Sequence, residues 1–178
     1  MPIDLAQVFK PWGPLPGVAE VRDQTGTWNR PGTTRQTWFT DGSKADERLT
    51  EIAEGHGFAY ELSGFTNVLA KLTSGVRGEW SFLPDGTGTS IRWTYDFRPL
   101  PGRRWIVAGP FKQLWIRYMR AALTRMVTVV QETPPRTGSP KRSMTTERAI
   151  CELTDDLLSP ERAGLRHPCR SEGSGVLG

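Results

Sequence analysis

Hydrophobic and polar residues alternate with a period of two along most of the segment from Val18 to Arg98. Such alternation is typical of strands that bury one face and expose the other. Short stretches rich in Gly, Asp and Pro separate the alternating runs and predict tight turns, so successive strands are expected to be neighbours in one antiparallel meander. Six strands are predicted: Val18–Trp28, Thr33–Thr40, Ser43–Ala53, Phe58–Phe65, Val76–Leu83 and Thr89–Arg98.

The period changes to that of a helix after the last predicted strand. Apolar residues at spacings of three and four form a single stripe from Phe111 to Glu132. Pro110 suits the first turn of this helix, and Pro134-Pro135 ends it. At about 1.5 Å per residue, the helix is long enough to lie across the whole sheet. The chain is therefore predicted to be an α+β protein in which a curved antiparallel sheet wraps around one long C-terminal helix.

Composition divides the chain near residue 132. The 7 Trp, 3 Tyr and 7 Phe residues all lie at or before Tyr118. A polar segment without aromatic residues cannot bury enough surface to offset the entropy lost on ordering. Residues 1–132 are therefore predicted to form one domain, and residues 133–178 a mostly disordered tail. Within this tail the spacing of apolar residues predicts one short helix, Thr146–Leu158.

Charge and cysteine usage narrow the classes of function. The net charge of +4 is spread over a nearly balanced mixture of acidic and basic residues, which predicts a solvated surface and no nucleic-acid partner. No apolar run approaches the roughly 20 residues that span a bilayer, and no signal peptide is visible. Both cysteines lie in the tail, and no Cys or His spacing suits a metal. We expect a cytoplasmic protein with no membrane insertion, no metal and no cofactor.

A series of short motifs resembles one superfamily. These motifs are, in order, Gly32-Thr33-Thr34-Arg35, Asp41-Gly42, Glu47-Arg48-Leu49, Phe58-Ala59-Tyr60, Gly78-Glu79-Trp80 and Gly88-Thr89-Ser90-Ile91-Arg92-Trp93. Together with the long final helix, they resemble the START-like, Bet v 1-like (SRPBCC) superfamily of polyketide cyclase/dehydrase and lipid-transport domains. The resemblance covers residues 8–132. It implies a helix-grip fold with an internal hydrophobic cavity between the sheet and the helix.

One strand of the family pattern is short or missing. Members usually begin with a full strand and two short helices, whereas here the segment from Phe9 to Val18 resembles the end of that helical region. The first strand normally covers an edge of the sheet. Its loss predicts an edge that is at least partly unpaired, and with it either association into a homodimer through that edge or poor solubility.

The resemblance places a few polar groups in the apolar cavity. Glu47 matches a cavity-facing Glu of the family and is the candidate general base or ligand contact. The alternative is a buried structural ion pair with Arg35, and Arg35 and Thr37 carry the same two interpretations. For the aromatic candidates the alternative is ordinary core packing. The remaining ligand-binding candidates are Phe39, Phe58, Tyr60, Trp80, Trp93, Tyr95, Trp115 and Met119.

The leading hypothesis is a cytoplasmic carrier or sensor of one hydrophobic small molecule of lipid, polyketide or aromatic type. The alternative is a polyketide cyclase/dehydratase-like enzyme with Glu47 as general base. Such an enzyme needs a second titratable group across the cavity, and only tyrosines are available for that role. A third hypothesis is a partner-binding module that uses the tail.

Overall fold

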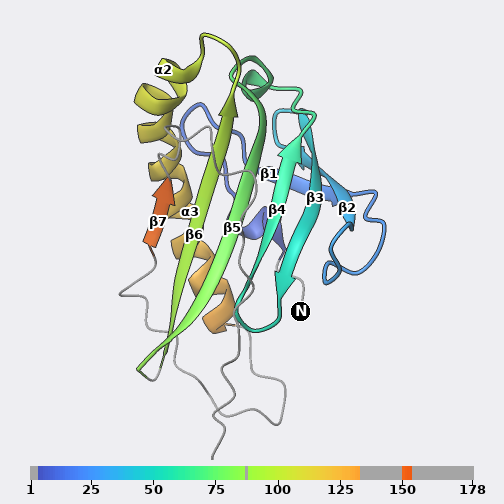
Figure 1. The fold of residues 1–178 in the computed structure, drawn as a ribbon, viewed down its shortest axis with the longest axis vertical. Coiled ribbons are helices and arrows are strands. Elements are labelled where there is room, and N and C mark those ends of the chain that lie inside the picture. Colours follow the sequence, from blue (N-terminus) through green and yellow to red (C-terminus); the bar gives the residue numbers. More distant parts are fainter. Residues whose placement is uncertain (1–3, 87, 133–149, 154–178) are drawn as a thin grey trace, which may run out of the picture.

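The computed structural model describes residues 4–86, 88–132 and 150–153. A bent sheet wraps around one long helix, α3 (Lys112–Glu132), as Figure 1 shows. The strands lie in the order of the sequence, and the first six are antiparallel to their neighbours. The predicted helix-grip architecture is thereby confirmed. The strands are β1 (Val18–Arg22), β2 (Thr34–Phe39), β3 (Lys44–Ala53), β4 (Gly57–Ser63), β5 (Thr73–Asp85), β6 (Gly88–Pro99) and β7 (Ile150–Leu153).

Short helical segments join the sheet to α3 and precede the first strand. A four-residue helix, α1 (Leu5–Val8), comes before β1, and η1 (Val68–Lys71) lies between β4 and β5. After β6 come α2 (Arg104–Ile106) and a π-helical turn, η2 (Val107–Phe111). The predicted helix is confirmed to within one residue at its start. Pro110 lies inside η2 instead of the first turn of α3, and the non-helical backbone of Gly109 (φ −100°, ψ −108°) bends the chain there.

The first strand is shorter than its alternating pattern predicts. β1 ends at Arg22, whereas the pattern continues to Trp28. Asp23 has a φ of 53°, a left-handed conformation that interrupts an extended strand. The pairing of Thr25 N with the Thr34 carbonyl oxygen, at 3.0 Å, then holds the following loop beside β2.

The C-terminal segment forms a strand where a helix was predicted. β7 pairs in parallel with Arg92–Tyr95 of β6, so the predicted helix is wrong at Ile150–Leu153. The rest of residues 133–178 lies outside the described residues. A physical reason is that the edge of β6 offers main-chain donors and acceptors to an extended segment, whereas a short isolated helix is marginal in water. The outer edge of β6 is therefore paired within the chain along Arg92–Tyr95, and the homodimer stays a prediction.

The core lies between β5, β6 and α3 and is built largely from aromatic rings. Trp93 is fully buried and stacks on Trp80 with ring centroids 4.0 Å apart. From α3, Trp115 meets both Tyr95 and Phe97 edge-on, each at 5.3 Å. Such pairs add about 0.5–1.5 kcal/mol each beyond the area that they bury. The interior that the helix encloses is therefore lined with aromatic surface.

Gly78 makes room for one of these rings. It lies opposite Tyr60 in the β4–β5 ladder, and a Cβ at this position would lie 2.6 Å from the Tyr60 hydroxyl oxygen. Gly78→Ala is expected to lower the free energy of unfolding by about 1–3 kcal/mol, because the buried ring must move. Urea denaturation measures the effect. Gly26→Ala is the control, since a Cβ there meets nothing within 4 Å. Equal stability of the two variants would contradict this account.

Candidate functional site

A buried ion pair joins β2 and β3 on the inner face of the sheet. Arg35 and Glu47 are cross-strand partners, and Arg35 Nε donates to Glu47 Oε2 at 2.7 Å. Their side chains are 13% and 6% exposed. The Thr37 hydroxyl donates to the same oxygen at 3.1 Å, and the Arg35 guanidinium lies 3.8 Å from the centroid of the Trp28 ring. The ion pair predicted from the sequence is confirmed.

This arrangement fixes the Glu47 carboxylate within the fold. Both hydrogen bonds end on Oε2, which leaves Oε1 as the oxygen that a ligand hydroxyl would meet. The Arg35 guanidinium is held between a carboxylate and an aromatic face, a position that suits its planar, weakly hydrated cation. The pair therefore has a structural role: it links β2 to β3 and fixes the position of the carboxylate.

Two tyrosines form a second polar group inside the core. The hydroxyl oxygens of Tyr60 and Tyr95 lie 2.7 Å apart, and Trp93 Nε1 donates to the Tyr60 hydroxyl at 3.2 Å. Burial raises the pKa of both phenols well above the ordinary range, and the negative charge of Glu47 raises the pKa of each further. Both phenols are therefore neutral at physiological pH. Because one of the two hydroxyls donates to the other, one O–H of the pair is available to donate to a ligand oxygen, and neither neutral phenol acts as a base.

One donor in the same interior has no partner. Trp115 Nε1 is buried and makes no hydrogen bond within the described part of the chain. Its ring packs against Tyr95, Phe97 and Phe111. A buried indole N–H normally finds an acceptor, because leaving it unpaired costs about 1–3 kcal/mol. The spacing of apolar residues along the predicted helix placed Trp115 in the core or in a cavity wall and gave no sign of this free donor.

The structure separates the predicted site residues into neighbouring groups. Phe58 is half-buried and stacks on Trp80 with centroids 5.9 Å apart, while Phe39 lies half-buried opposite Val18 and is not part of the core cluster. The ion-pair group consists of Arg35, Thr37 and Glu47. The aromatic core contains Tyr60, Trp80, Trp93, Tyr95, Trp115 and Met119.

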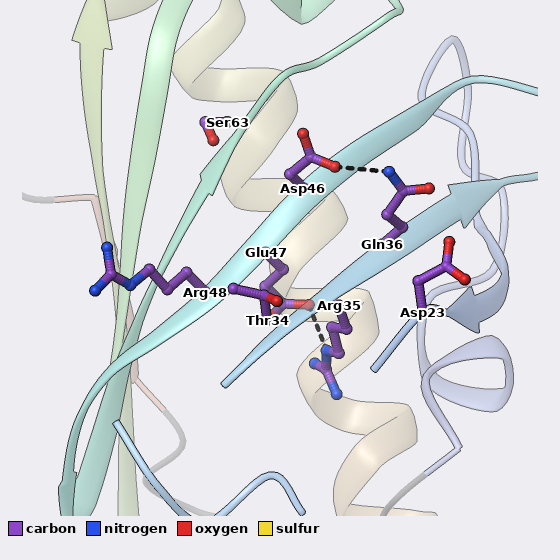
Figure 2. A pocket seen from close by; sticks show the side chains of 8 residues that line it. All are labelled: Asp23, Thr34, Arg35, Gln36, Asp46, Glu47, Arg48 and Ser63. Carbon is purple, nitrogen blue, oxygen red and sulfur yellow. Dashed lines mark hydrogen bonds and ion pairs between the residues drawn. The ribbon is translucent and has the colours of Figure 1, made fainter. Parts of the chain in front are cut away.

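A polar pocket of about 420 Å³ lies over β2, β3 and β4 and includes the ion-paired Arg35 and Glu47 in its lining (Figure 2). Along β2 and β3 its exposed members alternate with Arg35 and Glu47, so they project from the opposite face of the sheet. Gln36 Nε2 donates to Asp46 Oδ1 at 3.0 Å across it. This charged lining does not suit a hydrophobic ligand. The lining residues are Asp23, Thr34, Arg35, Gln36, Asp46, Glu47, Arg48 and Ser63.

The sequence analysis did not anticipate this pocket, because charged residues on an outer face are interpreted as solvated. Its carboxylates do not make a metal site: nowhere in the described residues do three His, Cys, Asp or Glu side chains gather as ligands would. Across the same residues, no helix is long and apolar enough to cross a membrane.

The sheet, the long helix and the aromatic interior define a helix-grip domain. A family model described as polyketide cyclase/dehydrase and lipid transport matches residues 4–131, and the chain belongs to this family. This match confirms the resemblance seen in the sequence, and the family binds hydrophobic small molecules. A crystal structure of Ara h 8.0201 is similar at 19% identity and a TM-score of 0.44, over 64% of this chain and 76% of that chain. No curated protein matches the chain.

Proposed function

We propose that the chain is a carrier or sensor that holds one hydrophobic small molecule between the sheet and α3. Family membership supports binding of this class of ligand. The observation that carries the proposal is the buried, unpaired Trp115 Nε1 within the aromatic interior. A ligand oxygen would satisfy this donor, while the surrounding rings would take up the apolar body of the ligand.

The chemistry of the interior favours a flat ligand with at least one acceptor. Tyr95 and Phe97 present aromatic surface beside the Trp115 indole, and the neutral phenols of Tyr60 and Tyr95 can orient a carbonyl or ether oxygen. A saturated chain without oxygen would leave the Trp115 indole N–H unpaired. An aromatic or polyketide-type carbonyl compound therefore fits better than a plain alkyl chain.

A cyclase or dehydratase with Glu47 as general base is the second candidate. One observation favours it: Glu47 lies opposite Leu62 in the β3–β4 ladder, Tyr60 is two residues from Leu62 on β4, and the Tyr60 hydroxyl contacts that of Tyr95, so a carboxylate and two phenols lie in the same part of the fold. Against it, Oε2 of Glu47 already accepts from Arg35 and Thr37. Native mass spectrometry of protein purified from its own host distinguishes the two, because a carrier retains an unaltered ligand.

Trp115→Phe tests the role of the indole N–H, because it keeps an aromatic ring and removes the donor. The probe is 6-propionyl-2-dimethylaminonaphthalene, a flat aromatic ketone whose emission reports on hydrogen bonding. The net contribution of one hydrogen bond is about 1–1.5 kcal/mol, so its loss is expected to raise the dissociation constant for the ketone about five- to tenfold. Unsubstituted naphthalene, which has no acceptor, is expected to bind both proteins alike.

Trp38→Phe is the matched control. Among the described residues, Trp38 Nε1 is also buried without a hydrogen-bond partner. Trp38 follows Thr37 on β2, so its side chain projects from the opposite face of the sheet, where Arg22 Cζ lies 4.6 Å from the centroid of its ring. Its loss is expected to leave the affinity for the ketone unchanged. Equal weakening by both substitutions, or none by Trp115→Phe, would remove Trp115 from the proposed site.

A further inference from the structure

Segments at the two ends of the sheet differ in charge. One end, here called the α2 end, consists of residues 66–72 around η1 and residues 100–106 around α2. These segments contain Lys71, Arg103 and Arg104 and no Asp or Glu. The neighbouring β2–β3 turn adds Asp41 and Lys44, which hydrogen bonds from Asn67 to Ser43 and from Thr66 to Lys44 place at this end, and basic residues still prevail there. The other end holds the β3–β4 and β5–β6 turns, where residues 49–59 and 81–91 contain Glu51, Glu54 and Asp85 and no Lys or Arg. Figure 1 shows α2 at the top of the sheet and the two turns at the bottom.

The positive charge continues from the α2 end along the final helix. Residues 99–131 contain six Lys or Arg residues and no Asp or Glu. The whole chain carries a net charge of only +4, so basic residues are concentrated in this part of the molecule. A charge distribution of this kind produces a field that orients the protein toward an anionic partner.

Two of the four exposed large apolar side chains of the described residues lie at the α2 end, and one of them, Trp105, is the most exposed; Ile52 and Leu83 lie at the opposite end. Trp105 is 70% exposed and Val68 is 53% exposed. A main-chain hydrogen bond from Leu100 N to Leu72 O, at 2.9 Å, ties the two segments together, so both side chains lie at the same end. Indole rings prefer the boundary between water and lipid, where the ring is partly buried and the N–H stays wet.

We propose that the α2 end docks on an anionic lipid surface. Trp105 and Val68 would enter the headgroup region, and Lys71, Arg103 and Arg104 would bind the anionic headgroups. Each basic residue near such a surface strengthens binding about fivefold. The acidic turns at the far end would be repelled, so the molecule would stand on its α2 end. An exposed Val at the same end as the Trp contributes nothing to the binding of a nucleic acid, which favours the lipid surface.

This inference does not depend on the proposed ligand site, and its test measures no ligand. The full chain is sedimented with vesicles of phosphatidylcholine alone and of phosphatidylcholine containing phosphatidylglycerol. We expect binding to the anionic vesicles only, and weaker binding at high salt because surface charges are then screened. Trp105→Ala is expected to weaken binding at least about tenfold, as loss of a buried large apolar side chain predicts. Lys71→Glu is expected to weaken it by a similar factor.

Leu83→Ala is the matched control. Leu83 is 58% exposed, but it lies at the acidic end of the sheet. Its loss is expected to leave vesicle binding unchanged, and circular dichroism verifies that all three variants are folded. The proposal is overturned if phosphatidylcholine alone binds equally well, if Leu83→Ala and Trp105→Ala weaken binding alike, or if a labelled oligonucleotide binds while anionic vesicles do not.

Discussion

Glu47→Gln is expected to lower the free energy of unfolding by about 3–5 kcal/mol. The substitution removes the negative charge that faces the Arg35 guanidinium, whose side chain is only 13% exposed. A cation left in that position keeps its desolvation penalty and loses the attraction that offset it. Urea denaturation of the variant and the parent measures the difference.

Glu61→Gln serves as the exposed counterpart of this experiment. Glu61 pairs with Arg98, and these side chains are 36% and 54% exposed, so its loss is expected to cost less than about 1 kcal/mol. A double variant, Arg35→Met with Glu47→Leu, is expected to recover most of the lost stability, because no unpaired charge remains. If Glu47→Gln instead keeps full stability and loses ligand affinity, the carboxylate serves the ligand. If it changes neither, Glu47 does not belong to the site.

Alkaline unfolding is the second large effect that we expect. All 3 tyrosines of the chain, Tyr60, Tyr95 and Tyr118, are buried. Burial raises the pKa of each, that of Tyr118 to about 12. Above about pH 10 the unfolded chain releases these protons while the folded chain retains them, so stability is complete below that pH and falls above it. The loss is about 1.4 kcal/mol per pH unit for each tyrosine.

Urea denaturation from neutral pH to about pH 11 measures this slope. Tyrosinate absorbance of the folded protein is expected to stay flat through the ordinary titration range and to appear only on unfolding. Tyr118→Phe removes one of the three protons and also the hydrogen bond to the Pro16 carbonyl oxygen, at 3.0 Å. The slope should then fall by about one third. A gradual absorbance rise near pH 10 in the folded protein would contradict the burial of these phenols.

The sheet and the long helix were predictable because each has one buried and one solvated face. The period of two marks such strands, and the spacing of three and four marks the stripe of α3 that meets them. The end of β1 was not predictable, since the left-handed backbone of Asp23 leaves no mark on the alternation. Nor was β7, because a strand of four residues forms only where an unpaired edge, distant in the sequence, accepts it.

The candidate site also has one part that the sequence predicts and another that it does not. The Arg35–Glu47 pair follows from register, because opposite charges occupy facing positions on neighbouring strands. The free donor of Trp115 depends on the rotamer of one side chain, and the polar pocket combines residues of β2, β3 and β4 with Asp23 from the loop after β1. Neither property is encoded in a pattern of apolar and polar letters. The sequence therefore predicts which residues line the interior and leaves open which polar atoms remain unpaired there.

The order of the strands has a consequence for assembly during synthesis. β1 to β5 each pair with the next strand along the chain, so each of these five ladders closes a short loop at a small cost in chain entropy. The ladder between β6 and β7 instead joins Tyr95 to Leu153, with the whole of α3 between them. Such a non-local contact forms late, and a ladder of this length is among the first to open. While the ribosome holds the C-terminal segment, the outer edge of β6 is available to strands of other nascent chains. Once β7 pairs with β6, this part of the edge is covered and can no longer pair with another chain.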